Sequence, residues 1–170
     1  VLNEFAWPKA ESLTVVFGRD AGMPGSGWKL EAGMSTPNDS LKATLKFLVK
    51  GDYLYLGAKV KDRFVGGSKD WERFDGLLMS LKNHADPGAP KPPVEYFYSW
   101  WRPESTDPQP VDQAPAFAGR WAEYPPGTPR TPVQIENWDA VTVVDGHSNS
   151  DADFDNGYTV EMRFKLSVLG

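Results

Sequence analysis

The chain of 170 residues contains no cysteine and only two histidines, and these absences exclude several kinds of site. Without cysteine there is no disulfide framework, no thiolate metal ligand, no cysteine nucleophile and no covalently attached c-type haem. The sequence also has no nucleophile elbow and no HExxH motif, and its glycine-rich segment 21–28 lacks the Gly-Lys-Ser/Thr ending of a phosphate-binding loop. We therefore expect a protein that is not an enzyme.

Long apolar runs and clustered positive charges are absent as well. No apolar run approaches the roughly 20 residues that a membrane-spanning helix needs. The formal net charge is −5, and the basic residues are scattered along the sequence, which argues against nucleic-acid binding because phosphates are neutralised by cations gathered on one face. The chain begins at Val1 in place of Met, so we expect a secreted, extracellular or periplasmic protein that can be a fragment of a larger one.

The sequence is rich in turn-forming and aromatic residues, with 15 proline, 16 glycine, seven Trp, nine Phe and six Tyr. Apolar and polar residues alternate in 41–50 and 53–60, and Lys50-Gly51-Asp52 between them predicts an antiparallel hairpin. We predict an all-β chain, a single antiparallel β-sandwich domain over 1–170 with immunoglobulin-like or jelly-roll-like two-sheet architecture. Its further strands are expected at 13–17, 74–81 and 94–101, in two short pieces within 133–144, and at 158–166.

The region 85–149 has the character of an insertion into this domain. It contains the proline-rich segment 103–132, which shows little periodicity but carries Phe117, Trp121 and Tyr124. So many aromatic residues argue against a free linker. We expect an ordered, proline-rich insertion packed on the sandwich.

The segments 41–84 and 150–170 resemble the family 9 carbohydrate-binding modules and the wider DOMON-like β-sandwich group. The resemblance is carried by GDYLYLGAKVKD, by Trp71 with Asp75 soon after it, and by an acidic turn followed by GYTVEMRFKLSVLG. It implies an antiparallel β-sandwich on a secreted protein, usually joined to a catalytic or cell-surface partner, that binds sugar ends or, in some relatives, haem b. Where the sugar-binding members have a glutamate, this chain has Leu78.

The resemblance and the local chemistry together favour a sugar site around Trp71. A sugar ring stacks its C–H face on an exposed aromatic ring and needs nearby directional hydrogen-bond partners. Trp71 supplies the ring, and Arg73 and Asp75 supply polar contacts. We expect Trp101 or Trp121 to supply a second platform. Burial of Trp71 as a cap on the sandwich is the alternative, because tryptophans are mostly buried.

An acidic turn offers a candidate metal site. Asp151, Asp153 and Asp155 alternate along the turn and present the oxygen ligands that Ca²⁺ prefers. The spacing is not that of an EF-hand, because Asn156 and Met162 stand where glycine and a bidentate glutamate are required. A solvated turn held by Asp and Asn side chains is the alternative, and the one we favour.

Two other functions stay open. A haem b-binding, electron-transfer module needs Met with His or Lys as axial ligands, but Met79 and Met162 fall on predicted core faces, which disfavours haem. The candidate histidines are His84 and His147. The second alternative is a structural or protein-interaction β-sandwich of a larger extracellular assembly, with 103–132 making the contacts.

Overall fold

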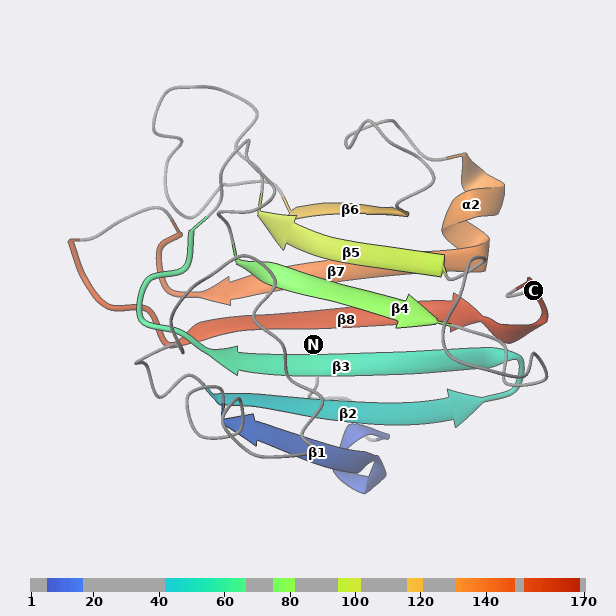
Figure 1. The fold of residues 1–170 in the computed structure, drawn as a ribbon, viewed down its shortest axis with the longest axis horizontal. Helices are drawn as coiled ribbons and strands as arrows, with labels where there is room; N and C mark the ends of the chain where they lie inside the picture. Colours follow the sequence, from blue (N-terminus) through green and yellow to red (C-terminus); the bar gives the residue numbers. More distant parts are fainter. Residues whose placement is uncertain are drawn as a thin grey trace, which may run out of the picture.

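The protein is an all-β chain of antiparallel strands (Figure 1). The computed structural model describes residues 6–16, 42–66, 75–81, 95–101, 116–120, 131–148 and 152–168. Their strands are β1 (Glu11–Val16), β2 (Lys42–Lys50), β3 (Tyr53–Lys61), β4 (Gly76–Leu81), β5 (Glu95–Trp101), β6 (Ala116–Arg120), β7 (Trp138–Asp145) and β8 (Gly157–Lys165). Short helical segments are η1 (Trp7–Lys9), α2 (Pro132–Asn137) and η5 (Leu166–Val168).

The strands form two sheets. One has five strands in the order β1-β2-β3-β8-β7, and the other has three in the order β4-β5-β6. In Figure 1 the three-stranded sheet lies in front of the upper part of the larger sheet. Every pair of neighbouring strands is antiparallel.

The predicted hairpin is confirmed as β2 and β3. Lys50 pairs with Tyr53 across the turn, and Gly51 has a positive φ of 59°. Because alternate side chains leave opposite faces of a strand, Leu56, Ala58 and Val60 are buried while the residues between them face away from the core.

The strand predicted from the clearest alternation is confirmed as β8, in the interior of the larger sheet. Its alternate residues Tyr158, Val160, Met162 and Phe164 are all buried. The strand starts at Gly157, whose φ is +119° and where a side chain would collide with the carbonyl oxygen of Val60. The prediction ran one residue too far, since β8 ends at Lys165.

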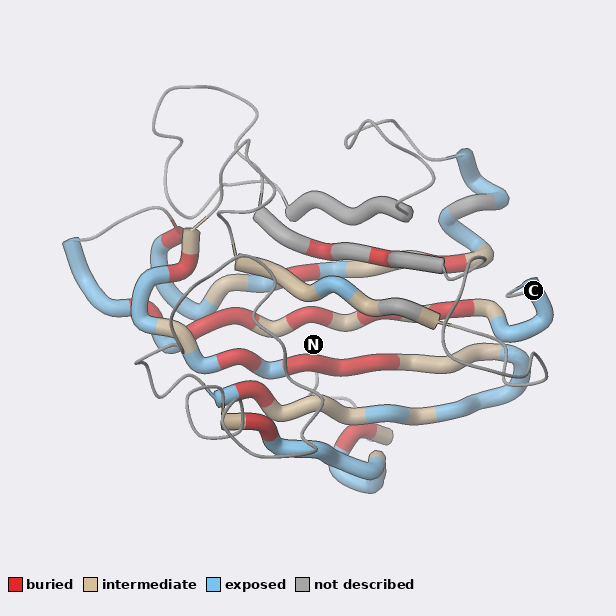
Figure 2. The backbone as a smooth tube through the Cα atoms, in the orientation of Figure 1, coloured by how far each residue is buried: buried red, intermediate tan, exposed pale blue. Residues whose placement is uncertain are grey.

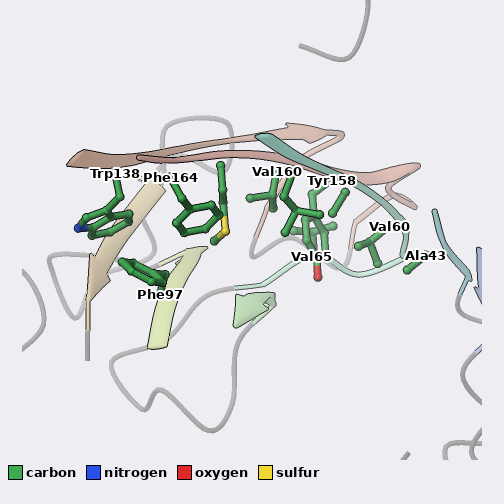
Figure 3. Packing of buried hydrophobic residues seen from close by; sticks show 11 residues of the cluster. Ala43, Val60, Val65, Phe97, Trp138, Tyr158, Val160 and Phe164 are labelled. Carbon is green, nitrogen blue, oxygen red and sulfur yellow. The ribbon is translucent and has the colours of Figure 1, made fainter. Parts of the chain in front are cut away.

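The two sheets meet in a shared core around Phe97 of β5 (Figure 3). Its ring centroid lies 4.8 Å from that of Phe164 on β8 and 5.2 Å from that of Trp138 on β7, in tilted or edge-on contacts. A buried hydrogen bond between the hydroxyls of Ser99 and Thr142 also joins the smaller sheet to β7. The smaller sheet therefore packs on β7 and β8.

Many residues of β1 and β2 are exposed (Figure 2), and some of them lie on the core-side face. Val15 and Ala43 are buried, whereas Leu13, Phe47 and Val49, which follow on the same face of the same two strands, are exposed. Alternation identifies a face of a strand, but it does not show how far an opposing layer extends over that face.

One predicted β-prone piece is a helix instead. Residues 132–137 form α2, with Pro132 as its first residue, where a fixed φ suits the helix and the missing N–H is not needed. The second piece is β7, as predicted. Of the proline-rich segment, 116–120 form β6, and the packing expected for 103–115 and 121–130 lies outside the described residues. In the part of the chain that the structure describes, no helix is long and apolar enough to cross a membrane.

Candidate functional site

Three carboxyl groups converge on one tripeptide at the end of β3. The backbone N–H groups of residues 64–66 donate, in chain order, to Asp62 at 3.0 Å, Asp155 at 2.7 Å and Asp75 at 2.8 Å. Asp62 directly follows β3, Asp155 lies in the turn before β8, and Asp75 is the residue before β4. We name this arrangement, residues 62–66 with Asp75 and Asp155, the loop end of the protein.

Backbone bonds run in the reverse direction and lock the same segments together. The Asp75 N–H donates to the carbonyl of Gly66 at 2.8 Å, and the Asp155 N–H donates to the carbonyl of Arg63 at 2.8 Å. The second carboxylate oxygen of Asp155 accepts the N–H of His147 at 2.6 Å. Asp155 is buried, so these bonds satisfy groups that water does not reach. The bonds of Asp155 fix residues 62–66 to the turn before β8. The bonds between Gly66 and Asp75 join the two residues that flank the segment 67–74.

Burial and like charge perturb the ionisable groups at the loop end. Desolvation raises the pKa of the Asp75 carboxyl to about 7, and the hydrogen bond from the Gly66 N–H opposes this rise. The negative charges of Asp62 and Asp155, and a hydrogen bond between the carboxyl groups of Asp75 and Asp62, raise the pKa further. Burial also raises the pKa of Tyr158, followed by repulsion from Asp75 and Asp62. The Tyr158 hydroxyl donates to the carbonyl of Gly76 at 3.0 Å. Asp75 thus changes charge around neutral pH.

An exposed aromatic pair projects from the loop end. The rings of Phe64 and Phe154 meet nearly edge to face, with centroids 5.3 Å apart and planes at 72°, although their residues are 50% and 68% exposed. The Arg63 guanidinium carbon lies 5.5 Å from the Phe154 ring centroid. Nearby in the chain, His147 Nδ1 and an Asp153 carboxylate oxygen lie 2.9 Å apart. This end therefore combines apolar ring surface with polar groups that form hydrogen bonds.

Only one of the predicted sugar contacts falls wholly within the described residues. Asp75 is half-buried, and one of its carboxyl oxygens accepts the Gly66 N–H, so it anchors the loop. Trp71, Arg73 and Trp121 lie outside the described residues. Trp101 is the last residue of β5 and pairs with Ala116 of β6, but its side chain is not described.

The predicted calcium ligands have separate surroundings where the structure describes them. Asp155 uses both carboxylate oxygens for backbone N–H groups, and Asp153 is exposed beside His147. Asp151 lies outside the described residues. Among the residues that the structure does describe, no three or more His, Asp or Glu side chains are placed to hold a metal ion.

The candidate haem ligands that the structure describes have different surroundings. Met162 is buried in the shared core and Met79 packs against it, as expected of gap-filling methionines. His147 is exposed at the acidic turn, and His84 lies outside the described residues.

Sequence reasoning missed Arg63, Phe64 and Phe154. A usable signal was present for Phe154, which is the one large apolar residue in the polar turn Asp145–Gly157. Its partner Phe64 could not be chosen from the sequence, because the two residues are 90 positions apart and meet through tertiary contacts that include the bonds of Asp155 to Arg63 and Val65.

Comparisons with known proteins found no matching family model, no similar curated protein and no similar solved structure.

Proposed function

We propose that this chain is a non-catalytic carbohydrate-binding module of an exported or surface protein, with the antiparallel β-sandwich architecture of the family 9-like, DOMON-like group. The observation that carries the proposal is the exposed Phe64–Phe154 pair. Phe64 lies on a loop whose three successive amides are bound by carboxyl groups, and Phe154 precedes Asp155, which supplies one of those groups. The all-β fold with two sheets agrees with this architecture.

The physical argument concerns pre-organisation. An exposed ring stacks on the apolar face of a sugar, and binding costs less when the ring is already held in place. The hydrogen bonds of Asp75 and Asp155 hold the backbone beside Phe64, and the Arg63 guanidinium lies close to the Phe154 ring. The polar groups of Arg63 and Asp153 supply donors and acceptors for sugar hydroxyls.

The proposed site also includes residues of the segment 67–74. This segment contains Trp71 and Arg73 and joins Gly66 to Asp75, which are bonded to each other at the loop end. Trp71 lies outside the described residues, and we include it as a further stacking residue because the resemblance to the carbohydrate-binding modules implies that role.

A glycan array with the full chain tests the proposal, followed by titration of the best ligand against Phe154→Ala. We expect affinity to fall at least about tenfold, which corresponds to losing roughly 1.4 kcal/mol of stacking, with little change in melting temperature. Phe47→Ala is the matched control, because Phe47 is also an exposed phenylalanine but lies on β2, and we expect it to keep full affinity. The proposal is wrong if the native chain binds no glycan, and the Phe154 platform is wrong if both variants bind equally.

A protein-interaction module is the second candidate. It is favoured by the exposed apolar residues Leu13, Phe47 and Val49 on the partly covered face of β1 and β2. Loss of self-association or partner binding on Phe47→Ser, in a chain that binds no glycan, would favour this function over the first.

A further inference from the structure

The face of the five-stranded sheet that points away from the core gathers the lysines of β2 and β3. Lys42, Lys50, Lys59 and Lys61 occupy positions that alternate with core residues, and all four are exposed. We name these four residues the lysine face. Lys42 and Lys50 are eight residues apart on one strand, so the face extends over about 26 Å.

The charges on this side of the sheet are unbalanced. Basic residues at outward positions of the described strands outnumber acidic ones: Lys42, Lys46, Lys50, Lys59, Lys61, Arg163 and Lys165 against Asp139, Asp145 and Glu161. The whole chain, in contrast, carries a net charge of −5. Among the described strands, positive charge is therefore in excess on the outward side of the five-stranded sheet.

Like charges face one another directly within the lysine face. Lys42 and Lys61 are register partners, and Lys59 lies two residues away opposite Thr44. Like charges at opposed positions destabilise a sheet. Within the described ranges, the four lysines of this face make no ion pair, whereas Lys165 pairs with Glu136 and Lys46 donates to the Trp7 carbonyl. An anionic ligand would relieve this repulsion.

Aromatic rings lie at the Lys50 end of the same side. Tyr53 and Tyr55 have ring centroids 6.2 Å apart, and the Arg163 guanidinium carbon lies 5.4 Å from the Tyr53 ring centroid. Both tyrosines are half-buried, and each offers part of a ring and a hydroxyl to a sugar. One guanidinium nitrogen of Arg163, Nη2, donates to the carbonyl of Ile135 at 2.9 Å, so this end offers an acidic sugar the positive charge of Arg163 beside the Tyr53 ring.

We propose that the lysine face binds an anionic polysaccharide, with carboxylate or sulfate groups on its sugars, along β2 and β3. The proposal rests on the proposed function in taking a glycan as ligand, and it adds a contact surface distinct from Phe64 and Phe154. A polysaccharide fits better than duplex DNA, because a flat sheet face has no projecting element to enter a groove. Strand geometry places Lys59 and Lys61 about 7 Å apart along β3 and Lys42 about 5 Å from Lys61 across the strands, a cluster that suits a polymer with closely spaced charges, while Lys50 lies about 26 Å further along β2.

The test compares two polymers with one backbone, polygalacturonate and its methyl-esterified, neutral form, by titration against the full chain at low salt. We expect the native chain to prefer polygalacturonate and to lose affinity as salt increases. The double variant Lys59→Gln with Lys61→Gln should bind it about tenfold more weakly, while Lys59→Arg with Lys61→Arg keeps the charge and should bind normally. The glutamine variant should melt at the native temperature or slightly above it, because the repulsion with Lys42 is gone.

Equal binding of polygalacturonate by the native and glutamine variants would overturn the proposal, as would a native chain that prefers duplex DNA or vesicles of anionic phospholipid. A chain that binds neutral glycans through Phe154 but does not bind polygalacturonate would overturn the proposal for the lysine face and leave the proposed function standing. Binding of polygalacturonate through Lys59 and Lys61 without any neutral glycan would support the lysine face and overturn the loop-end platform.

Discussion

The carboxyl group of Asp75 links the electrostatics of the loop end to folding stability. It lies beside Asp62 and Asp155, and desolvation is the main cause of its raised pKa of about 7. In an unfolded chain an aspartate has an ordinary pKa near 3.8. The folded protein therefore holds a proton on Asp75 across a pH range in which the unfolded chain does not.

This difference predicts that stability from Asp75 is present at low pH and lost as pH rises. Because the folded state binds the proton more tightly, the contribution is complete below about pH 4, falls between pH 4 and 7, and is absent above pH 7. A shift of about three pKa units corresponds to a loss of about 4 kcal/mol. Urea unfolding at several pH values gives the free energy of unfolding of the native chain and of Asp75→Asn. The change with pH in the difference between these two free energies measures the contribution of Asp75.

The asparagine variant keeps an oxygen that accepts the Gly66 N–H but carries no charge at any pH. Its stability relative to the native chain should therefore rise between pH 4 and 7. Asp153→Asn is the control, since Asp153 is exposed, and its difference from the native chain should not follow this course. A pH-independent difference for Asp75→Asn would contradict the raised pKa.

The segment 62–66 is an element whose shape depends on contacts distant in sequence. Asp155 lies 90 residues from Val65 along the chain, yet it accepts the N–H of Val65 and donates its own N–H to the carbonyl of Arg63. Because Asp155 is 5% exposed, losing its carboxylate leaves the buried N–H of Val65 without an acceptor and removes the part-buried bond to the N–H of His147. Asp155 is therefore the residue that fixes this loop to the turn before β8.

Asp155→Ala should accordingly destabilise the protein by about 2 to 3 kcal/mol, since the buried N–H of Val65 and the part-buried N–H of His147 lose their partner. Asp153→Ala, two residues earlier in the same turn, should cost less than about 0.5 kcal/mol because its pair with His147 is exposed. Chemical denaturation of both variants at pH 7 gives the two values. Similar losses for the two variants would mean that Asp155 does not hold the loop.

Sequence periodicity predicted the strands better than it predicted this loop. Residues of β3 and β8 alternate between core and outward positions, and that alternation is local information. The helix α2 was missed because Val133 and Ile135 suit a strand by composition, while the proline at its start favours a helix. The pairing of Phe64 with Phe154 could not be predicted, since no local pattern shows which turns become neighbours.

At the scale of the whole molecule, the sequence predicted two sheets but not the extent of their overlap. Phe97 packs on Phe164 and Trp138, so the smaller sheet covers β7 and β8, while Phe47 and Val49 remain exposed. The lysines show the same limit. In the sequence they appear scattered, which argued against nucleic-acid binding, but the two-residue period of β2 and β3 brings them to one face.

A shared core also predicts that the two sheets unfold together. Phe97 is 1% exposed and joins the three-stranded sheet to the five-stranded one, so Phe97→Ala should cost about 3 to 5 kcal/mol through lost contacts and a residual cavity. Phe47→Ala is the control, because Phe47 is 38% exposed and should cost less than about 1 kcal/mol. Guanidinium unfolding followed by circular dichroism and by tryptophan fluorescence should give coincident transitions in all three chains, with only the Phe97→Ala midpoint clearly lowered. Coupling through Phe97 requires both sheets to lose their packing in one step. Separate transitions, or equal losses of stability for the two alanine variants, would therefore mean that the smaller sheet folds without the core around Phe164.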